Sequence, residues 1–542
     1  MKNRQTHREE DAEMKQRTER RVELMPGRAS MAADRIAGAA NMRLARPSTR
    51  LLRFLSASAP DAVFLADMAE LITEARRTVS ARSQPHPDYT VRSARPLRVL
   101  LLGYTGAGNT GADLRTIGVI RQLRTLFGDG NIDITVFACG DMFDHPVLQS
   151  VHRLATGAQY VPDALEQVMP GFDVVLNVEG STYTSKFSDA LAGILIGGVA
   201  LAAAHGKHAF AYGIDAGTMS VSLQAFSVSQ HRGVHITARS SKALRRLKDL
   251  GIPAEEGADA AWGYLALSND GAPSRVTPVM HGLAPGEYVA LCPNNPYCWP
   301  VVSDVKRAMR LDHAGAQSNE RHGPFTFHTW DEARARSFSR YKQAFAEVMA
   351  WLVQHGVTPV LVAMEKLDAS ACHQIAAYLP FPVRVVVRGE HDLQTVARTV
   401  AEAKAVITTR YHAALLGLSH AVPTVGISMD ERIDQLFDDA DLSRWVCHTG
   451  DVDLAKRVEY LLTPWIVDGA DTLERVTPSK SRVNHRASAS PTRQIPLNDG
   501  KSLKDAYREL SCVQRKRFDE MGRRLVDTVL TDLDVRFSES KK

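Results

Sequence analysis

The chain of 542 residues has room for two or three domains, and its 44% hydrophobic and 23% charged residues are ordinary for a globular protein. These values exclude a collagen, a coiled-coil fibre and wholesale disorder. Residues 1–50 hold 12 basic and 7 acidic side chains, which accounts for the whole net charge of +5. The rest of the chain is therefore neutral, and no nucleic-acid partner is expected. The six cysteines form no CxxC pair, so we expect neither a metal centre nor a disulfide scaffold.

The amino-terminal segment carries charges of both signs and lacks the apolar core of a secretory signal. The most apolar stretch, residues 190–204, is short and rich in small side chains, which favours a buried helix over a membrane span. We therefore expect a cytoplasmic protein without a transmembrane segment. Peripheral association with a membrane stays open.

Strands that alternate with helices predict an α/β fold with two Rossmann-like domains. The first domain is expected at residues 96–270, with strands at 97–103, 132–138, 172–178 and 209–212 and a helix at 112–127. The second is expected at residues 288–465, with strands at 288–292, 358–363, 383–387, 405–407 and 424–427 and a helix at 337–355. A polar arm and helical extension (1–95) would precede them, and a flexible linker with a C-terminal helix at 503–537 (466–542) would follow.

A glycine-rich loop follows the first predicted strand and opens a helix. Gly106, Gly108, Asn109 and Gly111 give it the pattern G-x-G-x-x-G. Glycines let the backbone approach a ligand, and the helix N-terminus attracts an anion. A dinucleotide site wants an acidic residue about 20 positions further on, but the second strand ends some ten residues late, at residues 139–141. We expect a loop that faces an interdomain cleft; NAD or FAD binding and a ligand-free turn are the alternatives.

A second helix start carries an arginine and a histidine. The strand predicted to end at Ile407 leads through two threonines to Arg410 and His412. They would lie at the carboxyl edge of a parallel sheet, where ligands of open α/β folds bind. Arg410 could hold a phosphate or carboxylate with its planar fork, and His412 could transfer a proton near neutral pH. A surface arginine beside a helix-capping histidine is the alternative.

The stretch TRYHAALLGLSHAVPTVGISMD at residues 409–430 resembles the polysaccharide pyruvyl transferase family. Three other segments resemble the family in the same order: residues 103–111, residues 235–244 around Arg239, and residues 251–261 around Asp259. The resemblance covers about 97–447. It departs at Glu179-Gly180-Ser181, where the family has a run of glycines, and at Arg432, where some members carry lysine.

The resemblance implies a GT-B-like arrangement in which two domains face a cleft, and an enzyme that transfers pyruvyl from phosphoenolpyruvate. The acceptor would be a hydroxyl of a sugar or lipid-linked glycan, a precursor of a cell-surface polysaccharide or exopolysaccharide. Arg239, Arg410 and Arg432 would bind the donor, and His412 would transfer the proton. No metal and no cofactor besides the co-substrate phosphoenolpyruvate are implied.

Four further residues are candidates for substrate binding: Glu179 and Tyr183 for acceptor hydroxyls, and Asp215 and Asp259 as carboxylates facing the cleft. The aromatic loop at 294–299 could stack on a sugar ring or be a packed loop.

Two other functions stay open. One is a nucleotide-sugar glycosyltransferase of the same architecture, with Asp430, Glu431 or Asp434 on the ribose. The other is a non-catalytic relative that binds a glycan or a protein.

Overall fold

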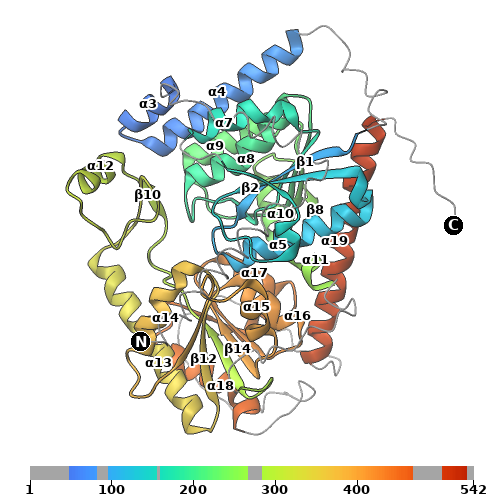
Figure 1. The fold of residues 1–542 in the computed structure, drawn as a ribbon. Helices are drawn as coiled ribbons and strands as arrows, with labels where there is room; N and C mark the ends of the chain where they lie inside the picture. Colours follow the sequence, from blue (N-terminus) through green and yellow to red (C-terminus); the bar gives the residue numbers. More distant parts are fainter. Residues whose placement is uncertain (1–47, 82–94, 156–158, 267–282, 468–502, 534–542) are drawn as a thin grey trace, which may run out of the picture. The chain divides into compact units, whose positions relative to one another are not determined.

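The computed structural model describes residues 48–81, 95–155, 159–266, 283–467 and 503–533 (Figure 1). The parts expected to be flexible, residues 1–45 and 476–500, lie outside the described residues. The chain divides after Leu52. All residues of the candidate site belong to the part from Arg53 onward.

The first half is built on an eight-stranded sheet whose strands are all parallel. Its order is β3-β2-β1-β4-β6-β7-β8, and β5 pairs with β6. The strands are β1 (Leu97–Thr105), β2 (Ile132–Ala138), β3 (His152–Leu154), β4 (Val174–Asn177), β5 (Ser181–Tyr183), β6 (His208–Ala216), β7 (His235–Ala238) and β8 (Glu255–Glu256). The central strands are near-continuous apolar runs, because helices cover both faces of a parallel sheet.

This half has the following helices, and from the second one onward they pack on the sheet or on each other. They are α3 (Thr49–Ser56), α4 (Pro60–Ala81), α5 (Thr110–Phe127), α6 (Pro146–Gln149), α7 (Val161–Val168), α8 (Asp189–Ala204), α9 (Val221–Gln230), α10 (Ser241–Asp249) and α11 (Ala261–Ala266), with short 3₁₀ turns η3 (Asp129–Asn131) and η4 (Met169–Gly171). The apolar stretch expected to be a buried helix is α8, which packs against α4, β4 and β6.

The second half repeats the design with a six-stranded parallel sheet of order β13-β12-β9-β14-β15-β16. Its strands are β9 (Tyr288–Cys292), β12 (Thr358–Ala363), β13 (Arg384–Val387), β14 (Ala405–Thr408), β15 (Thr424–Ser428) and β16 (Val446–His448). Its helices are α13 (Glu332–Gln354), α14 (Ala369–Ala376), α15 (Leu393–Ala401), α16 (Tyr411–Ser419), α17 (Glu431–Asp438) and α18 (Leu454–Ile466), with η5 (Lys366–Asp368) and η6 (Ser443–Trp445).

Two additions complete the described chain. Between β9 and α13 an insertion folds as an antiparallel hairpin of β10 (Val301–Ser303) and β11 (Thr326–His328), with α12 (Val305–His313) in its loop. The C-terminal helix α19 (Leu503–Leu533) packs against α5 and α11 of the first half and α16 of the second (Figure 1). Gln122 of α5 donates a hydrogen bond to the carbonyl of Phe518 at 2.7 Å, which ties this helix to the first half.

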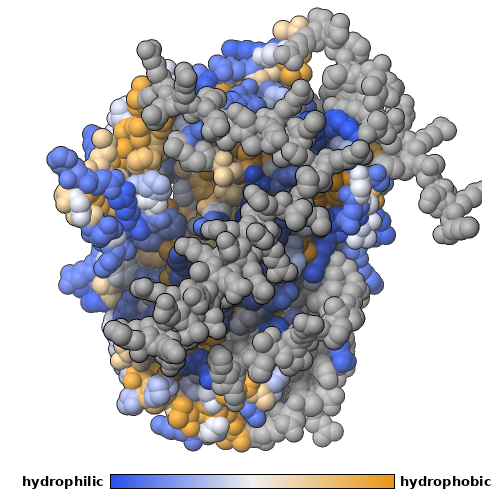
Figure 2. Space-filling view, in the orientation of Figure 1, coloured by the Kyte–Doolittle hydropathy of each residue, from blue (hydrophilic) through white to orange (hydrophobic). Residues whose placement is uncertain are grey.

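The coloured surface in Figure 2 is largely hydrophilic, with hydrophobic residues at the lower end and at the upper left of the view. Among the helices that the structure describes, none combines the length and the apolar character needed to cross a bilayer.

The expected fold class, two Rossmann-like α/β sheets, is confirmed, and the strands at 132–138, 288–292 and 358–363 have their predicted limits. The strand expected at 172–178 is shorter, and the helix expected from residue 337 begins five residues earlier, at Glu332 behind its N-cap Asp331. The strands β3, β5 and β16 were not predicted, since three residues are too few to show a period. The domain boundaries stay a prediction.

Candidate active site

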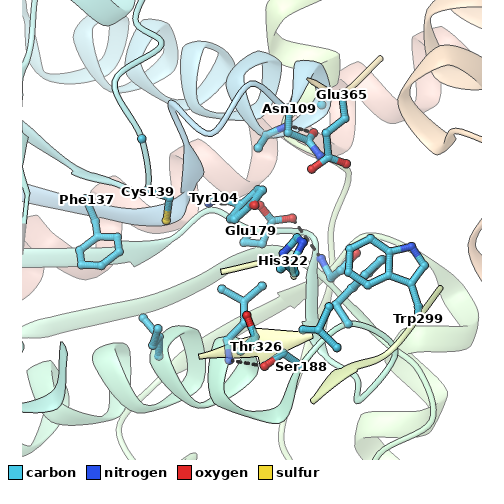
Figure 3. Close-up of a pocket in the computed structure, with 18 of the residues that line it drawn as sticks. Tyr104, Asn109, Phe137, Cys139, Glu179, Ser188, Trp299, His322, Thr326 and Glu365 are labelled. Carbon is cyan, nitrogen blue, oxygen red and sulfur yellow. Dashed lines mark hydrogen bonds between the residues drawn. The ribbon is translucent and has the colours of Figure 1, made fainter. Parts of the chain in front are cut away.

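A cavity of about 810 Å³ lies where the two sheets present their carboxyl ends. In both sheets the strand order reverses at one point, between β1 and β4 in the first and between β9 and β14 in the second. Ligands of open α/β sheets bind at such crossing points. The loops after β1 and β4, the start of α16 and the β10–β11 hairpin all contribute to the wall. Figure 3 shows the result, with Asn109 beside Glu365, Glu179 beside Tyr104, and Trp299 and Thr326 in other parts of the view.

The first part of the glycine loop docks on the second half, and only the end of the loop reaches the cavity. Gly106 and Gly108 have φ of 78° and 74°, a region that favours glycine. Two backbone hydrogen bonds, both of 3.0 Å, join the loop to the second half. The N–H of Thr110 donates to the carbonyl of Met364, and the N–H of Lys366 donates to the carbonyl of Gly108. Gly106 and Gly108 are therefore used for the turn and the docking, and neither lines the cavity.

The end of the same loop meets the histidine of the second half. A Cβ on Gly111 would lie 1.9 Å from Nδ1 and 2.5 Å from Cγ of His412. Asn109 caps α5 by accepting a hydrogen bond from the N–H of Ala112 at 3.1 Å. Asn109, Gly111 and His412 all line the cavity. Gly111 is thus the residue that lets the imidazole approach the start of α5.

Arg239 lies in the wall of the cavity, but carboxylates already hold its guanidinium. Its Nη2 lies 2.6 Å from Oδ2 of Asp215, and its Nη1 lies 2.8 Å from Oδ2 of Asp259. Arg115, also fully buried, donates to the same oxygen of Asp259. The guanidinium of Arg239 stacks 4.0 Å from the ring centre of Tyr411. Arg239 therefore connects the first half to the start of α16, and Asp215 and Asp259 stand behind it, outside the cavity wall.

His412 is arranged to be a neutral imidazole. Burial lowers its pKa, although Asp259 acts in the opposite direction. Its Nε2 lies 3.5 Å from Oδ1 of Asp259, and this buried nitrogen makes no hydrogen bond. Burial disfavours the charge of Asp259, but Arg115 and other cations hold its pKa well below the usual range. A permanent carboxylate thus stands close to a neutral base.

Arg410 is the N-cap residue of α16 and faces the cavity with a side chain that is 13% exposed. Its Nε donates to Asp368 at 2.8 Å, and its Nη2 lies 2.9 Å from Glu365. Burial opposes its charge, but Asp368 and Glu365 outweigh burial and raise its pKa. The positive charge of Arg410 is permanent and is offset by two carboxylates.

Arg432 also lines the cavity, where its Nε and Nη2 bind the carboxylate of Asp430 at 2.8 and 2.7 Å. Its guanidinium lies 5.0 Å from the ring centre of Phe187. The structure therefore brings the three arginines expected from the sequence to one cavity. Each of them is already paired with a carboxylate.

Residues 229–431 match the family model of polysaccharide pyruvyl transferase. The resemblance seen in the sequence is confirmed over these matched residues, which contain Arg239, Asp259, Arg410 and His412. The glycine loop at 103–111 and Arg432 lie outside the matched residues.

No curated protein sequence matches the chain. Among solved structures, UDP-GlcNAc 2-epimerase from Neisseria meningitidis bound to UDP-GlcNAc is 9% identical, with a TM-score of 0.48, and the match covers 80% of this chain and 100% of that one. S. aureus MnaA, solved with UDP, is 9% identical with a TM-score of 0.46 (81% and 97% covered). E. coli ADP-heptose LPS heptosyltransferase II is 12% identical with a TM-score of 0.33 (69% and 99% covered).

The two acceptor-side candidates of the first half differ in position. Glu179 lines the cavity, and its carboxylate accepts long backbone hydrogen bonds of 3.4 Å from Tyr104 and Ser181. Tyr183 is only 1% exposed and is not part of the cavity wall, and burial raises the pKa of its phenol. Of this pair, the structure places Glu179 where it can meet a substrate.

Several charged residues around the cavity were not predicted from the sequence. Asp113 and Arg388 form a buried ion pair at 3.0 Å between α5 and the end of β13. Arg115 could have been recognised from the sequence, because it is an arginine among the apolar residues of a helix that is buried. Glu365 and Asp368 come from the short turn after β12 and have no signal in the local pattern. Among the described residues, no group of three or more His, Cys, Asp or Glu side chains is placed to hold a metal ion.

Proposed function

We propose that the protein transfers pyruvyl from phosphoenolpyruvate to a saccharide and forms a pyruvate ketal. The observation that carries this proposal is the convergence of Arg239, Arg410 and His412, all in the matched family segment, on one cavity. The first half adds Asn109 and Gly111 to the same wall.

The attraction for a donor with a phosphate and a carboxylate comes from two helix N-termini as well as from arginines. The starts of α5 and α16 both line the cavity, through Gly111 and Ala112 in one helix and Tyr411 and His412 in the other. The first turn of a helix has backbone N–H groups without an intrahelical acceptor, and the helix dipole favours an anion there. In α5 the N–H groups of Thr110 and Ala112 are already bound to Met364 and Asn109, so its contribution comes mainly from the dipole. This positive potential does not depend on the arginines whose charge is offset by carboxylates. The charges of Arg239 and Arg410, which both line the cavity, would add to it.

The chemistry adds two saccharide hydroxyls to the central carbon of phosphoenolpyruvate. Its methylene carbon gains one proton and becomes a methyl group, and the bond to the phosphate oxygen breaks. One hydroxyl proton thus goes to carbon, and the other leaves with the phosphate. His412, held neutral by burial, would accept the proton of the attacking hydroxyl and deliver it to the methylene carbon. Asp259, 3.5 Å away, would stabilise the imidazolium between the two transfers.

A thermal-shift comparison tests the donor. Phosphoenolpyruvate, UDP-sugars, GDP-sugars and NAD are added side by side to the full chain. A ligand at 100 times its dissociation constant stabilises the native state by about 2.7 kcal/mol. We expect this shift with phosphoenolpyruvate alone. A shift with a nucleotide sugar alone would contradict the proposal.

Two of the three carboxylates named for the glycosyltransferase alternative are engaged elsewhere. Asp430 binds Arg432, and Asp434 accepts a hydrogen bond from Ser428 at 2.8 Å. No specific contact of these residues therefore favours a nucleotide sugar. A non-catalytic relative would bind a saccharide without consuming phosphoenolpyruvate, which an assay of phosphate release distinguishes.

A further inference from the structure

The cavity is larger than the proposed donor requires. Phosphoenolpyruvate has ten non-hydrogen atoms, and at water's share of about 30 Å³ each they fill no more than about 300 Å³. The cavity measures about 810 Å³, so more than half of it stays open for a second molecule. The wall of that second part includes the insertion between β9 and α13, through Trp299, Val301, His322, Pro324 and Thr326.

The insertion is fastened at both of its sides. The N–H of Val301 donates to the carbonyl of Phe187 at 2.8 Å, and the hydroxyl of Ser303 donates to Asp61 at 2.6 Å, so β10 is held by the first half. On the side of the second half, Nη1 of Arg334 donates to the carbonyl of Trp299 at 2.9 Å. The indole is therefore carried by a backbone fixed from two directions, as a binding platform requires.

Rings and uncharged polar atoms dominate this part of the wall. Trp299 meets Phe187 and His322 edge to face, with ring centres 4.9 and 5.5 Å apart. Nδ1 of His322 is buried and makes no hydrogen bond. Burial lowers the pKa of His322 to about 4, so the imidazole is neutral at neutral pH. A buried polar atom without a partner is costly unless a ligand satisfies it. Figure 3 shows His322 between Glu179 and Thr326, inside the cavity.

We propose that Trp299 and His322 form the acceptor subsite and bind an uncharged pyranose ring. The apolar face of the sugar packs on the indole, and a sugar hydroxyl makes the hydrogen bond that Nδ1 of His322 lacks. A uronic acid ring is disfavoured, because the insertion side chains on this wall carry no positive charge at neutral pH. The role of this sugar as the acceptor rests on the proposed function. The binding of a sugar ring, however, can be measured without the donor.

Saturation-transfer NMR with the full chain tests the subsite. The probes are the methyl glycosides of galactose, glucose and mannose, and the methyl glycoside of glucuronic acid. We expect signals from at least one neutral glycoside, with affinity reduced about tenfold or more in Trp299→Ala and His322→Ala, and retained in Trp299→Phe. Trp330→Ala is the matched control, because Trp330 belongs to the same insertion, is 37% exposed and is not part of the cavity wall.

Other results of these binding experiments would contradict the subsite or separate it from the proposed donor. The subsite is wrong if no neutral glycoside gives a signal, if Trp299→Ala leaves the signal unchanged, or if the glucuronide binds best. It is also wrong if Trp299→Ala abolishes the thermal shift by phosphoenolpyruvate, since Trp299 would then serve the donor. If the wild type ignores phosphoenolpyruvate but binds a neutral glycoside through Trp299, the proposed donor fails and the subsite stands.

Discussion

The contact between Gly111 and His412 can be tested with a single methyl group. Gly111 has no positive φ that would forbid a side chain, so Gly111→Ala perturbs only space. The new Cβ would lie 1.9 Å from Nδ1 of His412, whereas unbonded heavy atoms pack at about 3.5–4.0 Å. The imidazole or the start of α5 must therefore move by more than about 1.5 Å. Overpacking of this kind costs roughly 1–3 kcal/mol.

A double-mutant cycle isolates the contact. In a His412→Ala background the clash is gone, and alanine has a helix propensity up to about 1 kcal/mol better than glycine. Gly111→Ala should then be neutral or stabilising, so the sign of its effect reverses. Denaturant unfolding of the four proteins measures a coupling of about 1–3 kcal/mol, far above the roughly 0.5 kcal/mol expected of independent sites. An equal cost in both backgrounds would show that α5 and His412 do not meet.

Three further predictions concern the charged groups. Arg239→Met should lower the free energy of unfolding by roughly 3–5 kcal/mol, because it leaves the buried Asp215 and Asp259 with less compensation; a loss of donor affinity without a loss of stability would contradict this. Burial depresses the pKa of His412, so its contribution to the stability of the native state is complete above about pH 6.5 and should be lost as the pH falls below 6.5. The melting temperatures of wild type and His412→Gln should therefore converge on the acid side. Arg410→Ala should weaken phosphoenolpyruvate binding roughly tenfold to over a hundredfold in calorimetry, and Arg410→Lys should rescue little, since an ammonium cannot bind the donor with a planar fork; full rescue by lysine would refute the assigned geometry.

The sequence predicted the position of the site in the fold, but it did not predict which charged side chains pair there. Buried strands that end in Gly103 and Ile407, each followed by a helix start, place Arg410, His412 and the glycine loop at the carboxyl edges of two sheets. The loop was expected to face a cleft, and Asn109 and Gly111 do line the cavity, but the backbone of Gly108 and Thr110 binds the turn around Met364. No local pattern shows that contact, because it joins residues some 250 positions apart.

The carboxylates that pair with the arginines could not be predicted from the sequence either. Arg239 and Arg410 were expected to bind the donor, and nothing in the sequence showed that Asp259 and Glu365 already pair with them. Ion pairs of this kind depend on which turns the fold brings together, and spacing along one strand or helix carries no information about them. Trp299 is the exception, since an aromatic loop directly after a strand was a signal for a position in the cleft.

Mass spectrometry of saccharides tests the central claim most directly. The enzyme is incubated with candidate saccharides and, in parallel, with phosphoenolpyruvate, UDP-sugars or GDP-sugars as donor, and with His412→Gln as the control protein. Phosphoenolpyruvate alone should give a product heavier by pyruvate less one water, with equimolar release of phosphate, and His412→Gln should form it far more slowly. A product heavier by one sugar residue, or phosphate release without any adduct, would show that the protein is not a ketal-forming pyruvyl transferase.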